Sequence, residues 1–388
     1  MNILITVSTY YPEKDGVAVV TKYLAEGLAA KGNNVTVVTS LVDNNSEEKY
    51  NDVTIKRVNL YTKAGFYYGE KKEYLSLIEK ELTNTDVMIN VCTQNAFTDL
   101  LLKNIKKYKC KKILYMHGMY NFRYTKLDFS SVKSILNKLW KEIRWLYYYF
   151  INANNFKCYD KVIQLHEKDD GYKFFKKFYN IDSKVIENAT DDMFFETISN
   201  EKNLKNKEKY IIYVANYSDG KNQKLAIKQY LKANIDKKIS LICIGSKKNN
   251  YYYELEKLSH ELKKKYGYSE NEKKIILLTE IERKSIPEYV KNAEFFLMTS
   301  KGEKYPLSLI EAMACGTPFI TTKVGIAESL PGGIISKPKE ISKNIEKLIT
   351  DENLSTKLGK EGYEYARKYA MKKDKIEMLN QCIKDITK

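Results

Sequence analysis

Twelve short apolar runs, rich in β-branched residues, constrain the fold of this chain more than any other feature. Six lie in each half of the sequence, and longer segments with the 3.6-residue periodicity of helices separate them. The runs are ILITVS, VTVVTS, VMINVC, KILYMH, KVIQLH and KVIEN, followed by YIIYVAN, SLICIG, KIILLT, EFFLMTS, PFITT and GGIIS. Such alternation is typical of parallel α/β units. We therefore predict an α/β protein with two doubly wound domains facing a central cleft.

The length of the chain agrees with two domains. At 388 residues it exceeds the roughly 250–300 residues at which single hydrophobic cores stop growing. Between the two sets of runs lies ETISNEKNLKNKEK, a polar stretch without apolar periodicity, which is typical of a linker at 196–209.

The charge of the chain is basic and unevenly distributed. Sixty-six Lys and Arg against 49 Asp and Glu give a net charge of +17, and residues 101–150 alone hold twelve basic and two acidic residues. This balance indicates an acidic partner, such as phosphates, nucleic acid or an anionic membrane. We expect no nucleic acid, because no helix-turn-helix, zinc or RNP pattern is present.

The cysteines and the start of the chain indicate the compartment. Six cysteines are scattered without a C-x-x-C pair, which argues against a zinc site and against a disulfide framework. No apolar run reaches the ~18 residues of a spanning helix, and the chain begins directly with a strand pattern. We expect a cytoplasmic protein.

In doubly wound sheets, ligands bind beyond the carboxyl ends of the strands. After the first strand, Gly16 opens a helix that Gly32 ends; glycine there allows close approach to a ligand, and a tight turn is the alternative explanation. His117 follows the fourth strand of the first half. In the second half, Lys221 precedes a helix, an arrangement that suits a phosphate.

The segment EKYPLSLIEAMACGTPFI contains the strongest candidate site. We expect Glu303 in a loop after a strand, Pro306 at the first position of a helix, and Glu311 on that helix, which ends at Gly316 and Pro318. Two carboxylates near a helix start could together bind a sugar, a phosphate and a ribose. The alternative is a pair of glutamates on a solvated surface.

These motifs resemble those of glycosyltransferase family 4, the retaining transferases of the GT-B fold. The likeness covers E-x7-E followed by EAMACGTP, the glycine loop in STYYPEKDGVAVVTKYLAEGLAAKG, the domain junction in VIENATDDMFF and the phosphate segment in YVANYSDGKNQ. It implies an acceptor-side domain at 1–192 and a nucleotide-sugar-binding domain at 193–370. It also implies that the last helix, 371–388, packs back on the first domain.

The resemblance also implies roles for individual residues. Glu311 would hold the ribose hydroxyls, Glu303 would contact the donor sugar near the reacting carbon, and Lys221 would bind the diphosphate. The implied catalytic residues are Glu303, Lys221 and His117. The implied donor-binding residues are Gly16, Asn188, Asn216, Lys221, Lys304, Tyr305, Pro306, Leu307 and Glu311. No Asp-x-Asp spacing occurs, so we expect neither a metal nor another cofactor.

Three positions depart from the family pattern. Asn216 stands where an arginine usually lies five residues before the lysine, and one cationic diphosphate contact is thereby in doubt. Lys304 replaces a glycine beside the sugar pocket and either adds a cation or points to solvent. Asp15 replaces the first glycine of a Gly-Gly pair, and an acid there is unfavourable near a diphosphate unless it faces the acceptor.

The implied function is retaining transfer of a sugar, of the hexosyltransferase type. The donor would be a nucleotide-diphosphate-sugar, and the acceptor a hydroxyl of a glycan or lipid-linked molecule, in bacterial surface polysaccharide or glycolipid synthesis. The main alternative is a non-catalytic GT-B partner subunit, which the missing arginine favours and the two glutamates oppose. A phosphorylase or an epimerase of the same fold is a further alternative.

The basic segment 101–150 contains SVKSILNKLWKEIRWLYYYF, which the periodicity predicts to be an amphipathic helix. The apolar stripe consists of Val132, Ile135, Leu136, Leu139, Ile143, Leu146 and Phe150, and the basic face of Lys133, Lys138, Lys141 and Arg144. One hypothesis packs the stripe on the sheet and leaves the basic face in solvent. The other adds Trp140 and Trp145 at the flanks and places the basic face on an anionic membrane, the inner face of the plasma membrane.

Overall fold

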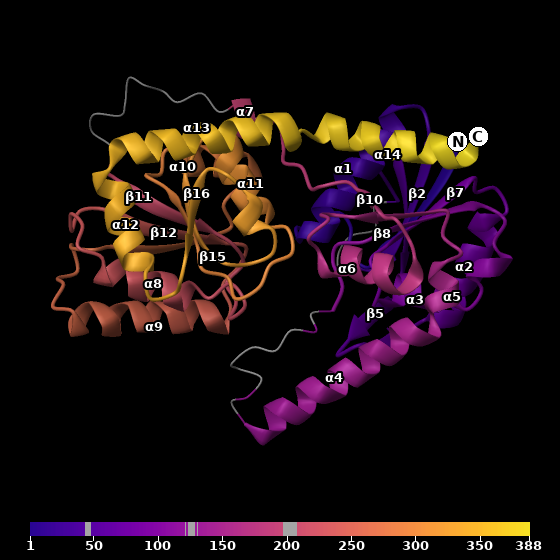
Figure 1. The fold of residues 1–388 in the computed structure, drawn as a ribbon, viewed down its shortest axis with the longest axis horizontal. Coiled ribbons are helices and arrows are strands. Elements are labelled where there is room, and N and C mark those ends of the chain that lie inside the picture. The colour runs from indigo at the N-terminus through magenta and orange to yellow at the C-terminus, as the bar shows by residue number, and fades with distance from the viewer. Residues whose placement is uncertain (43–47, 121, 123–128, 130, 197–207) are drawn as a thin grey trace. The chain divides into compact units, whose positions relative to one another are not determined.

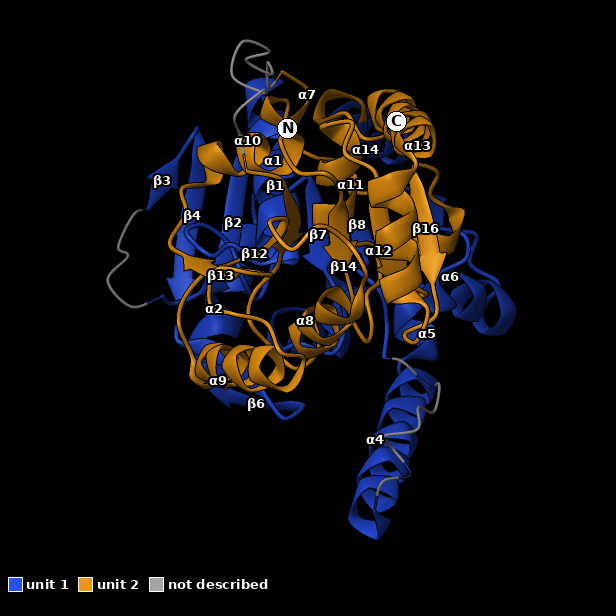
Figure 2. Cartoon of the chain, turned by 90° about the vertical axis from the view of Figure 1, so that its left-hand side faces the viewer, with its two compact units in different colours: residues 1–187, 375–388 blue, residues 188–374 orange. Residues whose placement is uncertain are grey.

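The computed structural model describes residues 1–42, 48–120, 122, 129, 131–196 and 208–388 (Figure 1). The chain forms two compact units, one of residues 1–187 and 375–388 and one of residues 188–374 (Figure 2). Of the predicted linker at 196–209, residues 197–207 lie outside the described part of the chain. The described helices include none that is long and apolar enough to cross a membrane.

Unit 1 contains an eight-stranded sheet in the order β10-β9-β8-β7-β1-β2-β4-β3. Its strands are β1 (Asn2–Thr6), β2 (Asn34–Ser40), β3 (Lys49–Tyr50), β4 (Val53–Val58), β7 (Val87–Val91), β8 (Lys111–Tyr115), β9 (Lys161–Gln164) and β10 (Lys184–Val185). All neighbours pair in parallel except β3 with β4. The six strands predicted in the first half are therefore confirmed, and so is the α/β class.

The sequence patterns did not reveal four strands of unit 1. β4 pairs in parallel with β2, but Lys56 and Arg57 interrupt its apolar pattern, so it does not stand out as a buried run. The short β3 lies at the edge of the sheet beyond β4. A separate antiparallel hairpin consists of β5 (Leu60–Lys63) and β6 (Phe66–Gly69).

Side-chain caps mark the start of four helices of unit 1, namely α1, α3, α4 and α6. Asn95 caps α3 by accepting hydrogen bonds from the first backbone N–H groups of that helix. The helices are α1 (Gly16–Ala30), α2 (Lys71–Leu82), α3 (Ala96–Leu102), α4 (Val132–Ile151), α5 (Ala153–Phe156) and α6 (Asp170–Phe174). From residue 375 onward, the last helix α14 (Lys372–Thr387) belongs to unit 1. There Gly27 on α1 allows close approach of Ile376, since a Cβ at Gly27 would lie 2.4 Å from the Ile376 Cδ1.

The orientation of α4 contradicts the hypothesis that its predicted apolar stripe packs on the sheet. All seven residues of its predicted apolar stripe are exposed: Val132, Ile135, Leu136, Leu139, Ile143, Leu146 and Phe150. On the opposite side Tyr149 and Trp145 are buried, and so is Lys138. The hypothesis of an apolar stripe packed on the sheet is therefore wrong. Membrane binding stays a prediction, but Lys138 and Trp145 are buried and do not lie on an exposed face as predicted. Trp145 and Tyr149, which the predicted stripe did not include, lie on the face of α4 that packs on the unit.

Unit 2 contains a six-stranded parallel sheet in the order β13-β12-β11-β14-β15-β16. The strands are β11 (Tyr210–Val214), β12 (Ser240–Gly245), β13 (Ile275–Thr279), β14 (Phe296–Met298), β15 (Phe319–Thr322) and β16 (Gly333–Ser336). All six predicted strands are confirmed. The helices are α7 (Met193–Glu196), α8 (Gln223–Lys232), α9 (Asn250–Lys265), α10 (Ile286–Lys291), α11 (Leu307–Ala314), α12 (Ile341–Thr350) and α13 (Glu352–Tyr369).

Among its parallel strands, each sheet has one point where the direction of the strand order reverses. In unit 2 it lies between β11 and β14, and in unit 1 between β1 and β7. Ligands of doubly wound sheets bind at such points, beyond the carboxyl ends of the strands. A ligand site is therefore expected in the loops that follow these strands.

Candidate active site

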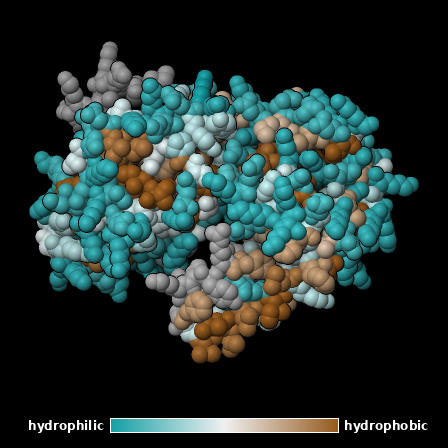
Figure 3. Space-filling model, viewed as in Figure 1, coloured by the Kyte–Doolittle hydropathy of each residue, from teal (hydrophilic) through white to brown (hydrophobic). Residues whose placement is uncertain are grey.

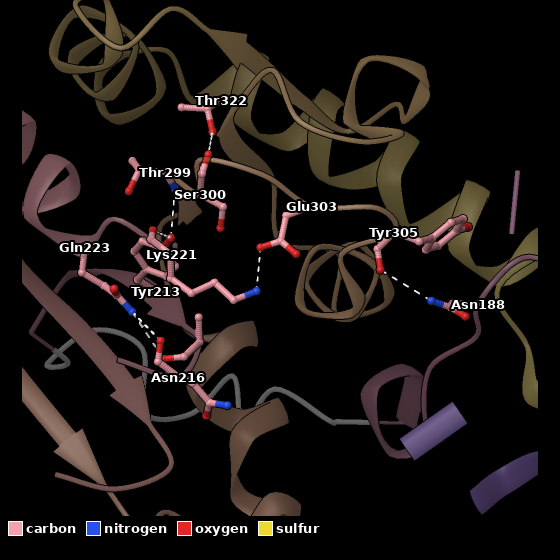
Figure 4. Close-up of polar contacts among 11 residues, drawn as sticks. Asn188, Tyr213, Asn216, Lys221, Gln223, Thr299, Ser300, Glu303, Tyr305 and Thr322 are labelled. Atoms are coloured by element: carbon pink, nitrogen blue, oxygen red, sulfur yellow. Dashed lines mark hydrogen bonds and ion pairs between the residues drawn. The ribbon is translucent and has the colours of Figure 1, made fainter. Parts of the chain in front are cut away.

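The loops after β11 and β14 bring two predicted residues into contact. Lys221 Nζ lies 2.6 Å from Glu303 Oε1 (Figure 4). The Glu303 side chain is 12% exposed and that of Lys221 is 35% exposed, so the pair is only partly shielded from water. An ammonium and a carboxylate thus meet at the switch point of the unit 2 sheet.

Buried hydrogen bonds fix the backbone that carries Lys221. The hydroxyl of Tyr213, on β11, donates to the Lys221 carbonyl and accepts from the Thr299 N–H at 3.1 Å. The Thr299 hydroxyl in turn donates to the Asn222 carbonyl at 2.8 Å. Burial holds the pKa of Tyr213 above its usual value, so the phenol stays a neutral donor. Sequence reasoning missed Tyr213; its signal is a tyrosine within an apolar strand.

The loop that carries Glu303 depends on a glycine that sequence reasoning also missed. Gly325 follows β15 and has φ of +51°. A Cβ at this position would lie 2.6 Å from the Glu303 carbonyl oxygen and 2.4 Å from that of Lys304. The neighbouring Ile326 N–H donates to the Lys304 carbonyl at 3.3 Å. A side chain at Gly325 would push the Glu303 loop out of place.

Glu311 lies on α11 as predicted and is 5% exposed. Its carboxylate accepts a hydrogen bond from Arg283, whose guanidinium also lies 3.3 Å from Asp191 Oδ2 and 4.8 Å from the centre of the Phe194 ring. Asp191 also pairs with Lys372. The two glutamates of the motif therefore pair with different cations. Sequence reasoning missed Arg283, although it closely follows a predicted strand, where cleft residues are expected.

The start of α11 is close to its predicted place. Pro306 occupies the N-cap position without a capping hydrogen bond, one residue before the predicted first helical position, and Leu307 is the first residue of the helix. Tyr305 is buried, and its carbonyl accepts from the Asn188 side chain at 3.5 Å. The Asn188 Oδ1 is buried without a hydrogen-bond partner among the described residues. Such an oxygen is costly to bury unless something donates to it.

Asn216 and Lys304, the two residues of unit 2 that depart from the family pattern, lie in different surroundings. Asn216 is exposed, its carbonyl accepts from Gln223 at 3.1 Å, and its side chain points away from Lys221 (Figure 4). Lys304 is half-buried beside Glu303. Donor contacts of either residue stay predictions.

In unit 1, Gly16 is the first residue of α1 and Asp15 is its cap. The Asp15 carboxylate accepts from the Val17 N–H at 3.0 Å and the Ala18 N–H at 3.2 Å. Its acceptor capacity thus serves the helix start, which explains an acid at this position without a ligand.

His117 follows β8 and stacks on Tyr115, with ring centres 5.3 Å apart. Its Nε2 is shielded from solvent and has no hydrogen-bond partner among the described residues. Burial lowers the pKa of His117 to about 4, so its imidazole is neutral at pH 7. A neutral imidazole offers one donor and one acceptor to a hydroxyl.

The described residues contain no group of three or more His, Cys, Asp or Glu that could hold a metal ion. That the reaction needs no metal stays a prediction from the sequence.

Two family models match successive parts of the chain. Residues 14–164 match the model described as Glycosyltransferase Family 4, and residues 194–365 match that described as Glycosyl transferases group 1. The chain belongs to glycosyltransferase family 4. A curated relative, an uncharacterised glycosyltransferase of Methanocaldococcus jannaschii, is 30% identical over 101 residues, 24% of this chain. That match spans 29% of the relative's length.

Solved structures show that this family 4 member has the GT-B fold. Sucrose-phosphate synthase of Thermosynechococcus elongatus superposes with a TM-score of 0.76 at 16% identity, covering 99% of this chain and 98% of that one. HepE of Anabaena, solved in complex with UDP, superposes with a TM-score of 0.73 at 14% identity, covering 99% and 100%. The predicted fold and family are confirmed.

Proposed function

We propose that the protein is a retaining, hexosyltransferase-type enzyme that moves a sugar from a nucleoside diphosphate to a hydroxyl group. The acceptor is a glycan or a lipid-linked molecule, in bacterial surface polysaccharide or glycolipid synthesis. The observation that carries the proposal is the ion pair of Lys221 and Glu303 at the switch point of unit 2. It brings a cation and a carboxylate together at the edge of the sheet where ligands of doubly wound sheets bind, which supports a nucleotide-sugar site there.

Lys221 serves the leaving group. Departure of the nucleotide builds negative charge on the diphosphate, and a fixed ammonium stabilises that charge more in the transition state than in the ground state. In the free protein the same ammonium neutralises Glu303. The free N–H groups at the start of α11 add further donors.

Glu311 holds the ribose. A carboxylate has two oxygens, and Arg283 donates to Oε1. The second oxygen serves as the acceptor for a ribose hydroxyl. Arg283 is a positioning residue, because it fixes the carboxylate without contacting the reacting atoms. HepE was solved with UDP, which makes UDP-sugars the first donors to test.

His117 contacts the donor sugar as a neutral partner. Its lowered pKa keeps the charge of a cation away from the anomeric carbon, where positive charge develops during transfer. The acceptor hydroxyl attacks from the face of the leaving group, and the departing diphosphate takes its proton. We assign no protein base.

One observation favours the alternative, a non-catalytic GT-B partner subunit. Asn216 stands in place of a cation and points away from Lys221. A subunit of this kind would bind a nucleotide-sugar weakly or not at all and would not turn it over.

Thermal unfolding with a panel of UDP-, GDP- and other nucleotide-sugars tests the proposal. A ligand that binds only the native state at 100 times its Kd stabilises it by about 2.7 kcal/mol. We expect one nucleotide class to raise the Tm, followed by transfer or slow hydrolysis of that donor with retention at the anomeric carbon. Donor binding without any turnover would support the partner subunit, and inverted product would refute retention.

A further inference from the structure

The largest group of exposed apolar side chains in the described structure lies on one helix of unit 1. Ten exposed residues of α4 are apolar or aromatic, and they recur at helical spacing: Val132, Ile135, Leu136, Leu139, Trp140, Ile143, Leu146, Tyr147, Phe150 and Ile151. Figure 3 shows hydrophobic side chains gathered over this helix, along the lower edge of the view. Val132 is 73% exposed and Phe150 is 81% exposed. We call these ten residues the α4 stripe.

The opposite side of α4 is attached to the unit by specific polar contacts. The hydroxyl of Tyr148 donates to Asp99 Oδ1 at 2.5 Å, and Tyr149 shares a hydrogen bond of 3.0 Å with Thr93. Lys138 is 8% exposed and lies 3.5 Å from Glu142. Side chains that could remain in water are thus buried, while ten that avoid water are exposed. The contacts on the opposite side of α4 therefore set the outward orientation of the α4 stripe.

The hairpin of β5 and β6 extends this surface. Arg144 donates to the Gly65 carbonyl, and its guanidinium lies 4.3 Å from the centre of the Phe66 ring. Phe66 is itself exposed and lies near Trp140, with ring centres 6.3 Å apart. Exposed apolar patches of this extent mark interaction sites in proteins.

The charges beside the α4 stripe indicate which kind of partner it binds. Lys133 and Lys141 are exposed on the same helix. A second copy of the chain docked stripe to stripe would bring lysines of like charge together, which is unfavourable. An anionic bilayer accepts both features, because its acyl region takes up the apolar side chains and its headgroups attract lysines. Exposed Trp140 and Tyr147 are of the types enriched at membrane interfaces.

We infer that the α4 stripe is a membrane-docking surface, which lies in the plane of an anionic bilayer with its apolar side chains in the interface. The helix of 20 residues is about 30 Å long and would lie along the surface without spanning it. This inference deepens the proposed function, on which it rests only for its biological reason: a transferase at the bilayer meets a lipid-linked acceptor directly.

Vesicle flotation of the full-length protein tests the inference. Vesicles of phosphatidylcholine with about 30% of the anionic lipid phosphatidylglycerol are compared with vesicles of phosphatidylcholine alone. We expect binding to the anionic vesicles that falls at least about tenfold when the salt rises from 50 to roughly 500 mM. The protein contains two tryptophans. In W145F the remaining Trp140 should shift its emission to shorter wavelength on binding and be quenched by brominated lipid.

Matched variants separate the apolar from the charged contribution. The triple variant L136S/L139S/I143S changes exposed side chains and should lower vesicle binding at least about tenfold, with an unchanged circular dichroism spectrum. K133E/K141E should lower it to a similar extent. The controls lie on α9 of unit 2: exposed Y253S and the pair K257E/K264E should bind vesicles as the wild type does.

Three results would overturn the inference. These are absence of binding to anionic vesicles at low salt, equal loss in the α9 controls, and a wild-type dimer that L136S/L139S/I143S converts to monomers while vesicles stay unbound. Nucleotide-sugar binding, measured as thermal stabilisation of the same preparations, keeps the two proposals distinguishable. Lost vesicle binding with intact donor binding refutes the membrane surface alone, and the reverse refutes the proposed donor site alone.

Discussion

Units 1 and 2 have the same type of parallel sheet but differ in the groups that follow their strands. In unit 2 the candidate residues include charged groups that are already paired, as in Lys221 with Glu303 and Glu311 with Arg283. In unit 1 they are uncharged or already engaged: His117 is neutral at pH 7, and Asp15 serves as a helix cap.

Under the proposed function, this difference corresponds to two kinds of group in a nucleotide-sugar. A diphosphate is anionic and its departure requires cations, whereas a sugar presents neutral hydroxyls. Under the same proposal, pairing in the free protein would keep the unit 2 cations fixed before a donor binds, so little reorganisation would be left for the reaction itself. The comparison predicts large effects for changes in unit 2 charges and small ones for the neutral imidazole of unit 1.

The largest effect is expected for K221A. It removes the cation and leaves the Glu303 carboxylate uncompensated where the diphosphate would bind, so kcat/KM should fall by about three orders of magnitude. Steady-state transfer assays measure it. The control is K224A on α8, the helix that begins just after Lys221; its exposed ion pair with Glu254 should contribute little. Near-normal activity of K221A would assign the phosphate cation to another residue, such as Lys304.

The next effect concerns Glu311 and Arg283. E311A should weaken donor binding by about 1.5–3 kcal/mol, the range for hydrogen bonds to a charged group. R283A should weaken it less and R283K should restore part of the loss, because Arg283 only positions the carboxylate. Calorimetric titration with the donor nucleotide separates the three variants. Equal affinities in E311A and wild type would end the ribose assignment.

The contrast between the units also explains how far the sequence could predict the structure. All six strands of unit 2 are continuous apolar runs, and all were recognisable. In unit 1, β4 was hidden because Lys56 and Arg57 occupy its half-buried positions. The contact of Lys221 with Glu303 agrees with the motif. Arg283, at the start of a short 3-10 helix, and Gly325, in the loop after β15, are distant in sequence from the glutamates, and only the folded backbone brings them there.

The periodicity of the sequence could not predict the orientation of α4. A hydrophobic stripe predicts which residues share a face, but it does not say whether that face meets the protein or a partner. The deciding contacts are hydrogen bonds of Tyr148 and Tyr149 to Asp99 and Thr93. Their partners lie on the loop and helix after β7, which no local pattern connects to α4.

A smaller effect is expected for the stability of unit 1. Burial raises the pKa of Asp99 to about 7, although Tyr148 and Tyr67 donate to it and oppose the shift. The folded pKa lies above the unfolded value, so the folded state holds this proton more tightly. Its contribution to the free energy of unfolding is fully present below about pH 4, falls by at most roughly 1.4 kcal/mol per pH unit up to about pH 7, and is constant above.

The variant D99N tests this dependence. Both tryptophans lie in unit 1, so their fluorescence in urea reports the unfolding of that unit. The unfolding free energy of the wild type minus that of D99N should decrease from pH 5 to pH 7 and level off above. A difference that increases over this range would mean that the carboxylate, rather than the acid, is the favoured form in the folded protein.

The smallest effect is expected for His117, and its pH dependence is the informative part. With a pKa of about 4 the imidazole does not titrate near neutrality, so it should add no step to kcat/KM between pH 5.5 and 8.5. H117Q keeps a neutral donor and acceptor, and one neutral hydrogen bond is worth about 0.5–1.5 kcal/mol. The profiles of H117Q and wild type should therefore run parallel, separated by about tenfold or less. A step near pH 6.5 that is present in the wild type and absent from H117Q would show a charged imidazole. The contrast between a charged unit 2 site and a neutral unit 1 site would then be wrong.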